Sequence, residues 1–375
     1  MRVYLDNAAT TPLSKEVLDA MMPYFTEHFG NPSTTYSYGR DTRAAIETAR
    51  KTIASLLNAQ PGEITFTSGG TESANMAIKG AVDYLGVERI ITSPIEHHCV
   101  EYAVDYCRDY KKTEKVLIQT DNAGNIDLAH LENLLKSSGK KTLVALMHAN
   151  NEIGTMLNLK QVAEICKANQ ALFFSDTVQS FAHHIIDTKE IPVDFVTGSA
   201  HKFHGPKGSG FLYMRKQNKV QALIHGGGQE RGFRAGTENV AGIVGLAEAA
   251  KMAYNTLEED KKHILSLKYY FKQQLLDIFE DIDFNGNTDE RSLFTVLNVS
   301  FPPHENAPLL LFHLDLAGIC CSGGSACNSG AASGSHVIQA LNKNPDRVSI
   351  RFSFSKHNTK EELDYVLEKL KEIFK

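Results

Sequence analysis

Short apolar runs alternate with longer segments of helical hydrophobic spacing through much of the chain. Runs of β-branched and aromatic residues bounded by glycine, proline or polar residues are typical of buried strands. We expect such strands at 64–67, 90–92, 116–118, 143–147, 172–174, 193–197 and 208–214. Apolar residues three and four apart predict helices between them, at 74–84, 100–110, 128–135 and 159–168. This alternation indicates a mainly parallel sheet with helices on both faces.

The two ends of the chain follow a different pattern. A strand at 3–5 precedes helices at 14–25, capped by Ser14, and at 40–57. A long helical pattern from 240 to about 279 has few helix-breaking residues and predicts a spine between two domains. Beyond it we expect a small α+β layer, with strands at 294–299 and 349–354 and helices at 307–317 and 360–374. The sequence therefore predicts an α/β protein with a large domain over 14–255 and a small domain made of 1–13 and 256–375.

Composition narrows the classes of partner. The 375 residues carry a formal net charge of −5, with acidic and basic residues scattered along the chain, which leaves no basic stripe for nucleic acid. The first residues lack the charged start and apolar run of a leader, and no apolar segment approaches the roughly 20 residues needed to cross a bilayer. We expect a cytoplasmic protein that acts on small molecules or proteins, without direct contact with nucleic acid or membrane.

The cysteines indicate free thiols. The six have neither the spacing of a zinc site nor the density of a disulfide scaffold, so we expect a reducing compartment and no metal centre. Cys327 lies in residues 322–335, which are otherwise all glycine, serine, alanine or asparagine. Such a stretch is too poor in apolar side chains to pack against itself. It predicts a mobile loop, within 320–336, that carries Cys327.

Lys202 lies in a turn between the last two strands expected for the sheet. Gly205 and Pro206 follow it and prevent the continuation of a helix. A lysine in a buried turn most often reaches solvent or pairs with a carboxylate, and it acts as a nucleophile only where the site keeps it neutral. A second loop, 68–73, joins a strand to a helix. Backbone N–H groups favour an anion there, although such glycine-rich turns are also common for structural reasons.

Asp176 and Gln179 favour a chemical role for Lys202. Asp176 lies at the carboxyl end of strand 172–174, next to the strand that leads to Lys202, and ligands of parallel sheets bind at such ends. Alone, Asp176 could simply cap the next segment. Together with the lysine it matches what pyridoxal phosphate requires, a lysine for the aldehyde and a carboxylate for the ring nitrogen. Gln179 can donate a hydrogen bond to the phenolic oxygen of that cofactor.

Ten separated motifs resemble one family. They occur in order at 6–12, 29–32, 67–73, 96–97, 148–154, 176–179, 199–202, 226–237, 325–327 and 350–353. In this order and spacing they are similar to the motifs of the long-loop, group I cysteine desulfurases, which are class-V aminotransferases, and the match runs nearly from end to end. The resemblance implies the pyridoxal phosphate-dependent, aspartate-aminotransferase-like fold of fold type I and a homodimer. It also implies conversion of L-cysteine to L-alanine with a persulfide left on the enzyme.

The resemblance further implies roles for individual residues. Lys202 would be the Schiff-base lysine, His97 would stack on the cofactor ring and move protons, and Cys327 would take the substrate sulfur as a persulfide. The adjacent His98 is interpreted as an ordinary loop residue. Cofactor binding is implied for Gly70, Thr71, His97, Asn151, Asp176, Gln179, Ser199, His201, Lys202 and, from the other subunit, Thr237. Binding of the substrate carboxylate is implied for Asn31, Asn151 and Arg351.

Some alternatives stay open. A selenocysteine lyase, or another β-lyase or aminotransferase of this class, would share the fold and cofactor, but simple elimination needs no enzyme thiol, so Cys327 favours desulfuration. A binding or scaffold protein that kept the fold without the chemistry would be colourless. The sulfur acceptor stays open between a protein of iron–sulfur cluster assembly and one of tRNA thiolation. We expect Cys99, Cys107 and Cys166 to be small buried residues, and Cys320 and Cys321 either to be buried, which is favoured, or to relay sulfur.

Overall fold

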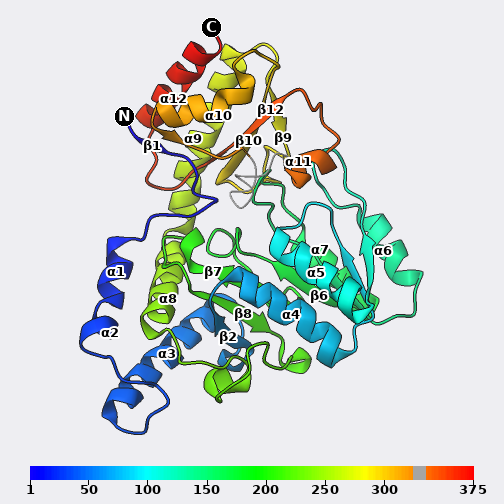
Figure 1. The fold of residues 1–375 in the computed structure, drawn as a ribbon, viewed down its shortest axis with the longest axis vertical. Helices are drawn as coiled ribbons and strands as arrows, with labels where there is room; N and C mark the ends of the chain where they lie inside the picture. The colour runs from blue at the N-terminus through cyan, green and yellow to red at the C-terminus, as the bar shows by residue number, and fades with distance from the viewer. Residues whose placement is uncertain (324–334) are drawn as a thin grey trace.

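The computed structural model describes residues 1–323 and 335–375. Its main element is a seven-stranded sheet formed by β2 (Ile64–Thr67), β3 (Arg89–Thr92), β4 (Glu114–Leu117), β5 (Thr142–Ala145), β6 (Leu172–Asp176), β7 (Phe195–Ser199) and β8 (Gly210–Met214). The strand order is β2-β8-β7-β6-β5-β3-β4 (Figure 1). Neighbours from β4 to β7 run parallel, and β8 runs antiparallel to β7 and β2. The mainly parallel sheet predicted from the sequence is confirmed.

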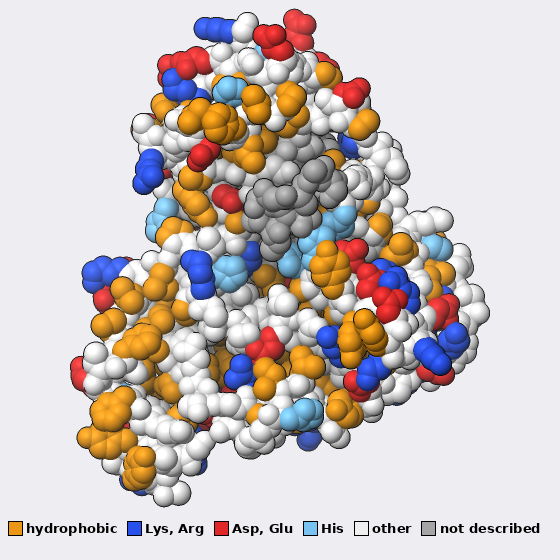
Figure 2. Space-filling view, in the orientation of Figure 1, with side chains coloured by type: hydrophobic (Ala, Val, Ile, Leu, Met, Phe, Trp, Pro, Cys, Tyr) orange, Lys and Arg blue, Asp and Glu red, His pale blue; other side chains and the backbone are white. Residues whose placement is uncertain are grey.

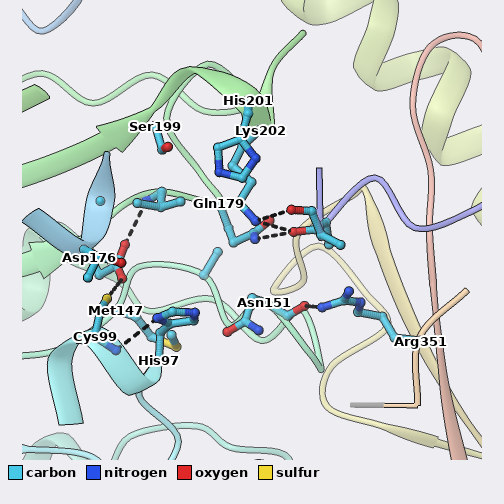
Figure 3. A pocket seen from close by; sticks show the side chains of 16 residues that line it. His97, Cys99, Met147, Asn151, Asp176, Gln179, Ser199, His201, Lys202 and Arg351 are labelled. Atoms are coloured by element: carbon cyan, nitrogen blue, oxygen red, sulfur yellow. Dashed lines mark hydrogen bonds between the residues drawn. The ribbon is translucent and has the colours of Figure 1, made fainter. Parts of the chain in front are cut away.

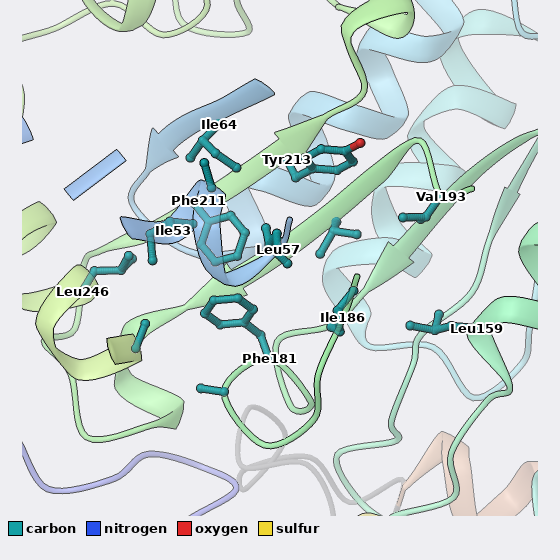
Figure 4. Close-up of a cluster of buried hydrophobic side chains, with 14 of the residues drawn as sticks. Ile53, Leu57, Ile64, Leu159, Phe181, Ile186, Val193, Phe211, Tyr213 and Leu246 are labelled. Atoms are coloured by element: carbon teal, nitrogen blue, oxygen red, sulfur yellow. The ribbon is translucent and has the colours of Figure 1, made fainter. Parts of the chain in front are cut away.

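Helices cover both faces of this sheet. They are α3 (Ser37–Leu56), α4 (Gly70–Leu85), α5 (His98–Lys111), α6 (Leu128–Lys136), α7 (Leu159–Ala168) and α8 (Val240–Asn255). Because successive strand residues point to opposite faces, Phe173 packs in a core with α3, α6, α7 and α8, whereas Phe174 packs in a core with α4 and α5. Figure 4 shows part of the first core. Cys107 and Cys166 are buried, as predicted.

A second group of elements packs around its own core, above the large sheet in Figure 1. It contains β1 (Val3–Tyr4), α9 (Leu257–Ile278), β9 (Asp283–Asn285), β10 (Val296–Phe301), α10 (Leu310–Leu316), β11 (Ile319–Cys320), β12 (Val348–Ser353) and α12 (Lys360–Ile373). The strands form an antiparallel sheet in the order β12-β10-β9 and a parallel pair, β1 with β11. Whether the two cores divide into domains at the predicted boundaries stays a prediction.

Several predicted helices are interrupted in the structure, and some short elements were not predicted. The helix expected at 14–25 is α1 (Lys15–Met21), capped by Ser14, followed by α2 (Pro23–Thr26), because Pro23 lacks the N–H that would continue the helix. The pattern from 240 to 279 is two helices, α8 and α9, that meet at Thr256. The helix expected at 307–317 begins as a 3-10 turn before α10. Strands β9 and β11 and the short α11 (His336–Ala340) were missed, since so few residues show no periodicity.

One corner of the surface is rich in exposed hydrophobic side chains. Figure 2 shows them at the lower left, where Figure 1 places α1, α2 and the start of α3. They include Leu13, Leu18, Met22, Phe25, Phe29, Tyr36 and Tyr38. Exposed apolar patches of this kind often mark protein interfaces. Within residues 1–323 and 335–375, no helix combines the length and apolar character needed to cross a membrane.

Phe181 links the main core to the turn that holds Lys202. Its buried ring packs edge-on against Phe203, Phe211 and Tyr254, with centroids 5.5, 4.7 and 5.6 Å away. Phe211 belongs to β8 and Tyr254 to α8, while Phe203 directly follows Lys202. Figure 4 shows Phe181 and Phe211 side by side. One aromatic ring therefore packs against β8, against α8 and against the residue that follows Lys202.

Replacing Phe181 by alanine removes these contacts and leaves a cavity. We expect a loss of about 3–5 kcal/mol in the free energy of unfolding. Guanidinium unfolding measures this loss. The control is Tyr110→Ala, because Tyr110 is 75% exposed and its replacement should change stability by no more than about 0.5 kcal/mol. A similar loss in both variants would contradict the role given to Phe181.

Candidate active site

The carboxyl ends of the parallel strands border a cavity of about 220 Å³ (Figure 3). This is several times the roughly 30 Å³ that one water molecule occupies in the liquid, so the cavity can hold a small organic molecule. Asp176 and Ser199 end β6 and β7, and His97 and Asn151 lie on segments that follow β3 and β5. The residues predicted from the sequence that line it are Gly70, Thr71, His97, Asn151, Asp176, Gln179, Ser199, His201, Lys202 and Arg351.

Lys202 lies in the short 3-10 turn η2 (Ala200–Lys202) between β7 and β8. Its Nζ donates hydrogen bonds to the backbone oxygens of Ala8, at 2.7 Å, and Ala9, at 2.9 Å. Figure 3 shows the amine reaching these two carbonyls at the cavity wall. The sequence did not indicate that residues 8 and 9 would take part, because their side chains carry no chemical signal. They entered the prediction only as part of a family motif.

Asp176 is held rigidly at the end of β6. Its Oδ1 accepts hydrogen bonds from the backbone N of Val178, at 2.9 Å, and from Oγ1 of Thr197, at 3.3 Å. Thr197 lies opposite Asp176 on β7, so the expected neighbourhood of the two strands is confirmed. The carboxylate is 6% exposed. It therefore keeps one orientation while a free lone pair on its oxygens can still face the cavity.

Cys99 is a cavity residue that the sequence interpretation missed. It was expected to be a small buried residue, but it is half-buried and lines the cavity from the first turn of α5. Its Sγ donates to Oδ2 of Asp176 at 3.8 Å. Burial, and then the Asp176 charge, raise the pKa of Cys99, so the thiol keeps the proton that it donates. The spacing of apolar residues indicated which side of α5 is buried. It did not indicate that the first turn of α5 lies at the carboxyl ends of the strands.

His97 caps α5 and is held in a single tautomer. Its Nδ1 accepts the backbone N–H of Cys99 at 3.2 Å, so the proton of the neutral ring lies on Nε2. Burial lowers the pKa of His97, and the positive charge of Lys202 lowers it further, while Asp176 acts in the opposite direction. The ring of His97 is therefore neutral at neutral pH.

The neighbouring residue Glu96 is buried. It accepts hydrogen bonds from Ser93 Oγ and Met147 N, and burial raises its pKa to about 8.

The N-terminus of α4 forms the polar rim of the cavity. Gly70, Thr71, Ser199 and His201 line both this cavity and an adjoining hollow over that N-terminus. Backbone N–H groups at a helix N-terminus have no acceptor within the helix and attract anions. The preceding Gly69 has a φ of 155°, which few residues other than glycine adopt. Burial lowers the pKa of His201 to about 4, so its ring is neutral at neutral pH before any ligand binds.

Arg351 and Asn151 form the opposite wall. Arg351 is 1% exposed, and its Nη1 and Nη2 donate to the backbone oxygen of Asn151 and to Oδ1 of Asp6, each at 2.7 Å. Its Nε is buried with no hydrogen-bond partner among the described residues. The guanidinium has five N–H donors, so donors remain for a carboxylate. The amide of Asn151 faces the cavity beside it, as Figure 3 shows.

Gln179 lies against the first segment of the chain. Its Nε2 donates to the backbone oxygen of Ala8 at 3.0 Å, and the side chain is 9% exposed. Ala8 therefore receives hydrogen bonds from both Lys202 and Gln179. The predicted phenolic-oxygen donor is present at the cavity, but in this arrangement its amide also anchors the N-terminal segment.

Some predicted residues lie elsewhere. Asn31 is exposed on the loop between α2 and α3, where its Oδ1 accepts from Ser33 N, and Thr237 is exposed beside a separate hollow. Neither lines the cavity of its own chain. Cys327 lies outside the described residues. Cys320 is exposed, so the preference for its burial was wrong, whereas Cys321 is half-buried and packs against the core of the second group of elements.

The residues around the cavity fit pyridoxal phosphate. The N-terminus of α4 suits the phosphate, Asp176 suits a protonated ring nitrogen, and Lys202 offers an amine for the aldehyde. The unpartnered Nε of Arg351 suits the carboxylate of an amino acid substrate. These four kinds of group stand on different sides of one cavity, which is the arrangement that such a ligand requires.

Comparisons with known proteins show which family the chain resembles. The family model described as aminotransferase class-V matches residues 3–366. Cysteine desulfurase IscS of Dictyoglomus turgidum is 44% identical over 377 residues, which cover 99% of this chain and 94% of that protein. Among solved structures, a NifS-like protein has a TM-score of 0.91 at 37% identity and covers 100% of this chain and 99% of its own. The structure of SspA in complex with cysteine has a TM-score of 0.83 at 31% identity, covering 95% and 100%.

The family model matches most of the chain, and the relatives are similar over nearly all of it. The chain therefore belongs to the class-V aminotransferases, within the cysteine desulfurase family.

Proposed function

We propose that the chain is a pyridoxal phosphate-dependent cysteine desulfurase, which converts L-cysteine to L-alanine and keeps the sulfur on Cys327 as a persulfide. The observation that carries this proposal is the convergence of Lys202, Asp176 and His97 on one cavity at the N-terminus of α4. Relatives that bear the name cysteine desulfurase support the activity. The SspA structure with bound cysteine supports the substrate.

Each side chain has a defined task in this proposal. Pyridoxal phosphate, when bound, supplies an electron-accepting ring that stabilises negative charge at the substrate α-carbon. Lys202 would hold the cofactor through its amine and act as the base for the α-proton. Asp176, fixed by Val178 and Thr197, stabilises positive charge on the ring nitrogen. His97 holds a proton on Nε2, where it can donate to the substrate or the ring.

Arg351 orients the substrate by its carboxylate. A guanidinium binds a carboxylate through two parallel hydrogen bonds, which fixes the direction of the amino acid as well as its position. The carbonyl of Asn151 and the carboxylate of Asp6 hold the guanidinium plane in place. Cys327 would then accept the sulfur of the bound cysteine, a role that rests on the family motif.

A homodimer would complete the site. Asn31 and Thr237 lie away from the cavity of their own chain, so in this proposal they serve the site of a second copy. The exposed hydrophobic corner formed by α1, α2 and the start of α3 supports such an interface. The persulfide would pass to a sulfur-acceptor protein of iron–sulfur cluster assembly or tRNA thiolation.

Lys202→Ala tests the cofactor role. The variant should lose the visible absorbance of the bound cofactor and at least about 1,000-fold of its turnover, because no other amine replaces the lysine. Lys216→Ala is the matched control, since Lys216 is exposed in the turn that follows β8, outside the cavity, and should change neither property. A colourless wild-type protein, or a Lys202→Ala variant with an unchanged spectrum, would overturn the assignment.

Cys327→Ser separates desulfuration from elimination. The variant should keep the visible spectrum of the cofactor but form neither persulfide nor alanine from cysteine, because serine cannot accept the sulfur. Cys320→Ser, which removes an exposed thiol outside the cavity, should still form alanine in the first turnover. Release of pyruvate and sulfide at an unchanged rate by Cys327→Ser would favour a β-lyase instead, and unchanged alanine formation would overturn the role of Cys327.

Arg351→Lys tests substrate orientation. Lysine keeps the charge but loses the planar fork, so the KM for cysteine should rise roughly 10- to 100-fold, equivalent to about 1.5–3 kcal/mol for charge-assisted hydrogen bonds. The cofactor spectrum should stay as in wild type. Asp6→Asn, which removes the ion pair but keeps the guanidinium, should raise KM less. Equal KM values for wild type and Arg351→Lys would refute this role.

A further inference from the structure

Three potential metal ligands gather outside the cavity, where the start of α5 meets the start of α11. His98 and Glu101 lie on the first turn of α5, and His336 is the first residue of α11. One nitrogen of each histidine and one oxygen of Glu101 lie within 4.8 Å of one another. Among the residues that the structure describes, this is the one such group of three. Figure 2 shows histidine side chains gathered near the middle of this face.

The hydrogen bonding of His336 leaves one of its nitrogens as an acceptor. Nε2 lies 2.9 Å from the backbone oxygen of Glu96, and a carbonyl has no proton to give, so Nε2 carries the ring proton. Nδ1 of the neutral ring therefore offers a lone pair. This atom is buried and has no hydrogen-bond partner in residues 1–323 and 335–375. Metal-bound histidines are commonly fixed in this way, by donating the other ring N–H to a carbonyl.

His98 and Glu101 present the other two ligands from one face of α5. Residues three apart on a helix are neighbours on its surface, and Nδ1 of His98 lies 2.9 Å from Oε2 of Glu101. The ring of His98 lies close to that of His336, with centroids 4.5 Å apart. The side chains of His98 and Glu101 are 13% and 33% exposed, so an ion can reach the carboxylate from solvent.

We propose that His98, Glu101 and His336 bind a divalent transition metal ion, for which zinc fits best. Zinc accepts imidazole and carboxylate ligands together, whereas magnesium and calcium prefer oxygen alone. Bonds of about 2.0–2.2 Å place two ligand atoms of a tetrahedral ion roughly 3.3 Å apart. The three ligand atoms, now within 4.8 Å, therefore need to close by no more than about 1.5 Å. A fourth position stays open for water.

The ion would connect two segments that flank the proposed chemistry. Helix α5 begins directly after His97, which is its N-cap. Helix α11 follows in sequence the residues that include Cys327. A metal between the two helix starts would hold them together without touching the cavity, so it is structural and independent of the proposed reaction.

Zinc titration of the purified holoenzyme tests the site. The measurement uses the Cys327→Ser background, so that this thiol cannot compete for zinc, after removal of metal with a chelator. Calorimetry should find one zinc per chain, and X-ray absorption should find nitrogen and oxygen ligands at about 2.0–2.2 Å with no sulfur shell. His336→Gln keeps a donor for the Glu96 carbonyl, and Glu101→Gln keeps the shape of the partly exposed side chain. Each should weaken zinc binding at least tenfold.

A matched control and the cofactor spectrum make the result decisive. His225→Gln removes an exposed histidine far from the group in sequence and should leave zinc affinity unchanged. An unchanged visible spectrum shows that each variant is folded. The proposal is overturned if zinc does not bind, if its ligands include sulfur, or if His336→Gln and Glu101→Gln bind zinc as tightly as the control.

Discussion

The segment 5–11 holds the two groups of elements together, and the cavity depends on it. On one side, the carboxylate of Asp6 pairs with the buried guanidinium of Arg351 on β12. On the other, the carbonyl of Ala8 accepts hydrogen bonds from Lys202 in the turn after β7. Removing one partner of a buried ion pair typically costs 3–5 kcal/mol, because the remaining charge is left unpaired. A few residues of the N-terminal segment therefore set the distance between Lys202 and Arg351.

The sequence predicted the parts of the site that follow directly from buried strands. Lys202 and Asp176 could be placed because their strands are visible in the hydrophobic pattern and parallel strands end at one edge of a sheet. The ion pair of Arg351 could not be foreseen, since Asp6 is 345 residues away and no local pattern links them. The two-residue strand β11 was missed for a similar reason, because only its pairing with β1 defines it. Family motifs, rather than periodicity, pointed to Arg351.

Burial sets the protonation of the site before any ligand binds. The lowered pKa of His97 keeps its ring neutral, and the raised pKa of Cys99 keeps its thiol protonated. Glu96, whose pKa is raised to about 8, is also largely protonated at neutral pH. The groups around Asp176 are therefore mostly neutral donors. A cationic ring nitrogen placed here would meet the carboxylate of Asp176 in a site of low dielectric constant, where the attraction between opposite charges is stronger than in water.

The antiparallel direction of β8 has a consequence for the order of folding. Because β7 and β8 run in opposite directions, a short connection joins them, and Ser199 pairs with Gly210 across the turn that carries Lys202. Contacts between residues this close in sequence have a low entropic cost of loop closure and form readily. The bond from Lys202 to Ala8 spans 194 residues, so its loop-closure cost is higher. The lysine turn can thus form early, while the hydrogen bonds that hold its amine form only when the N-terminal segment packs against the turn.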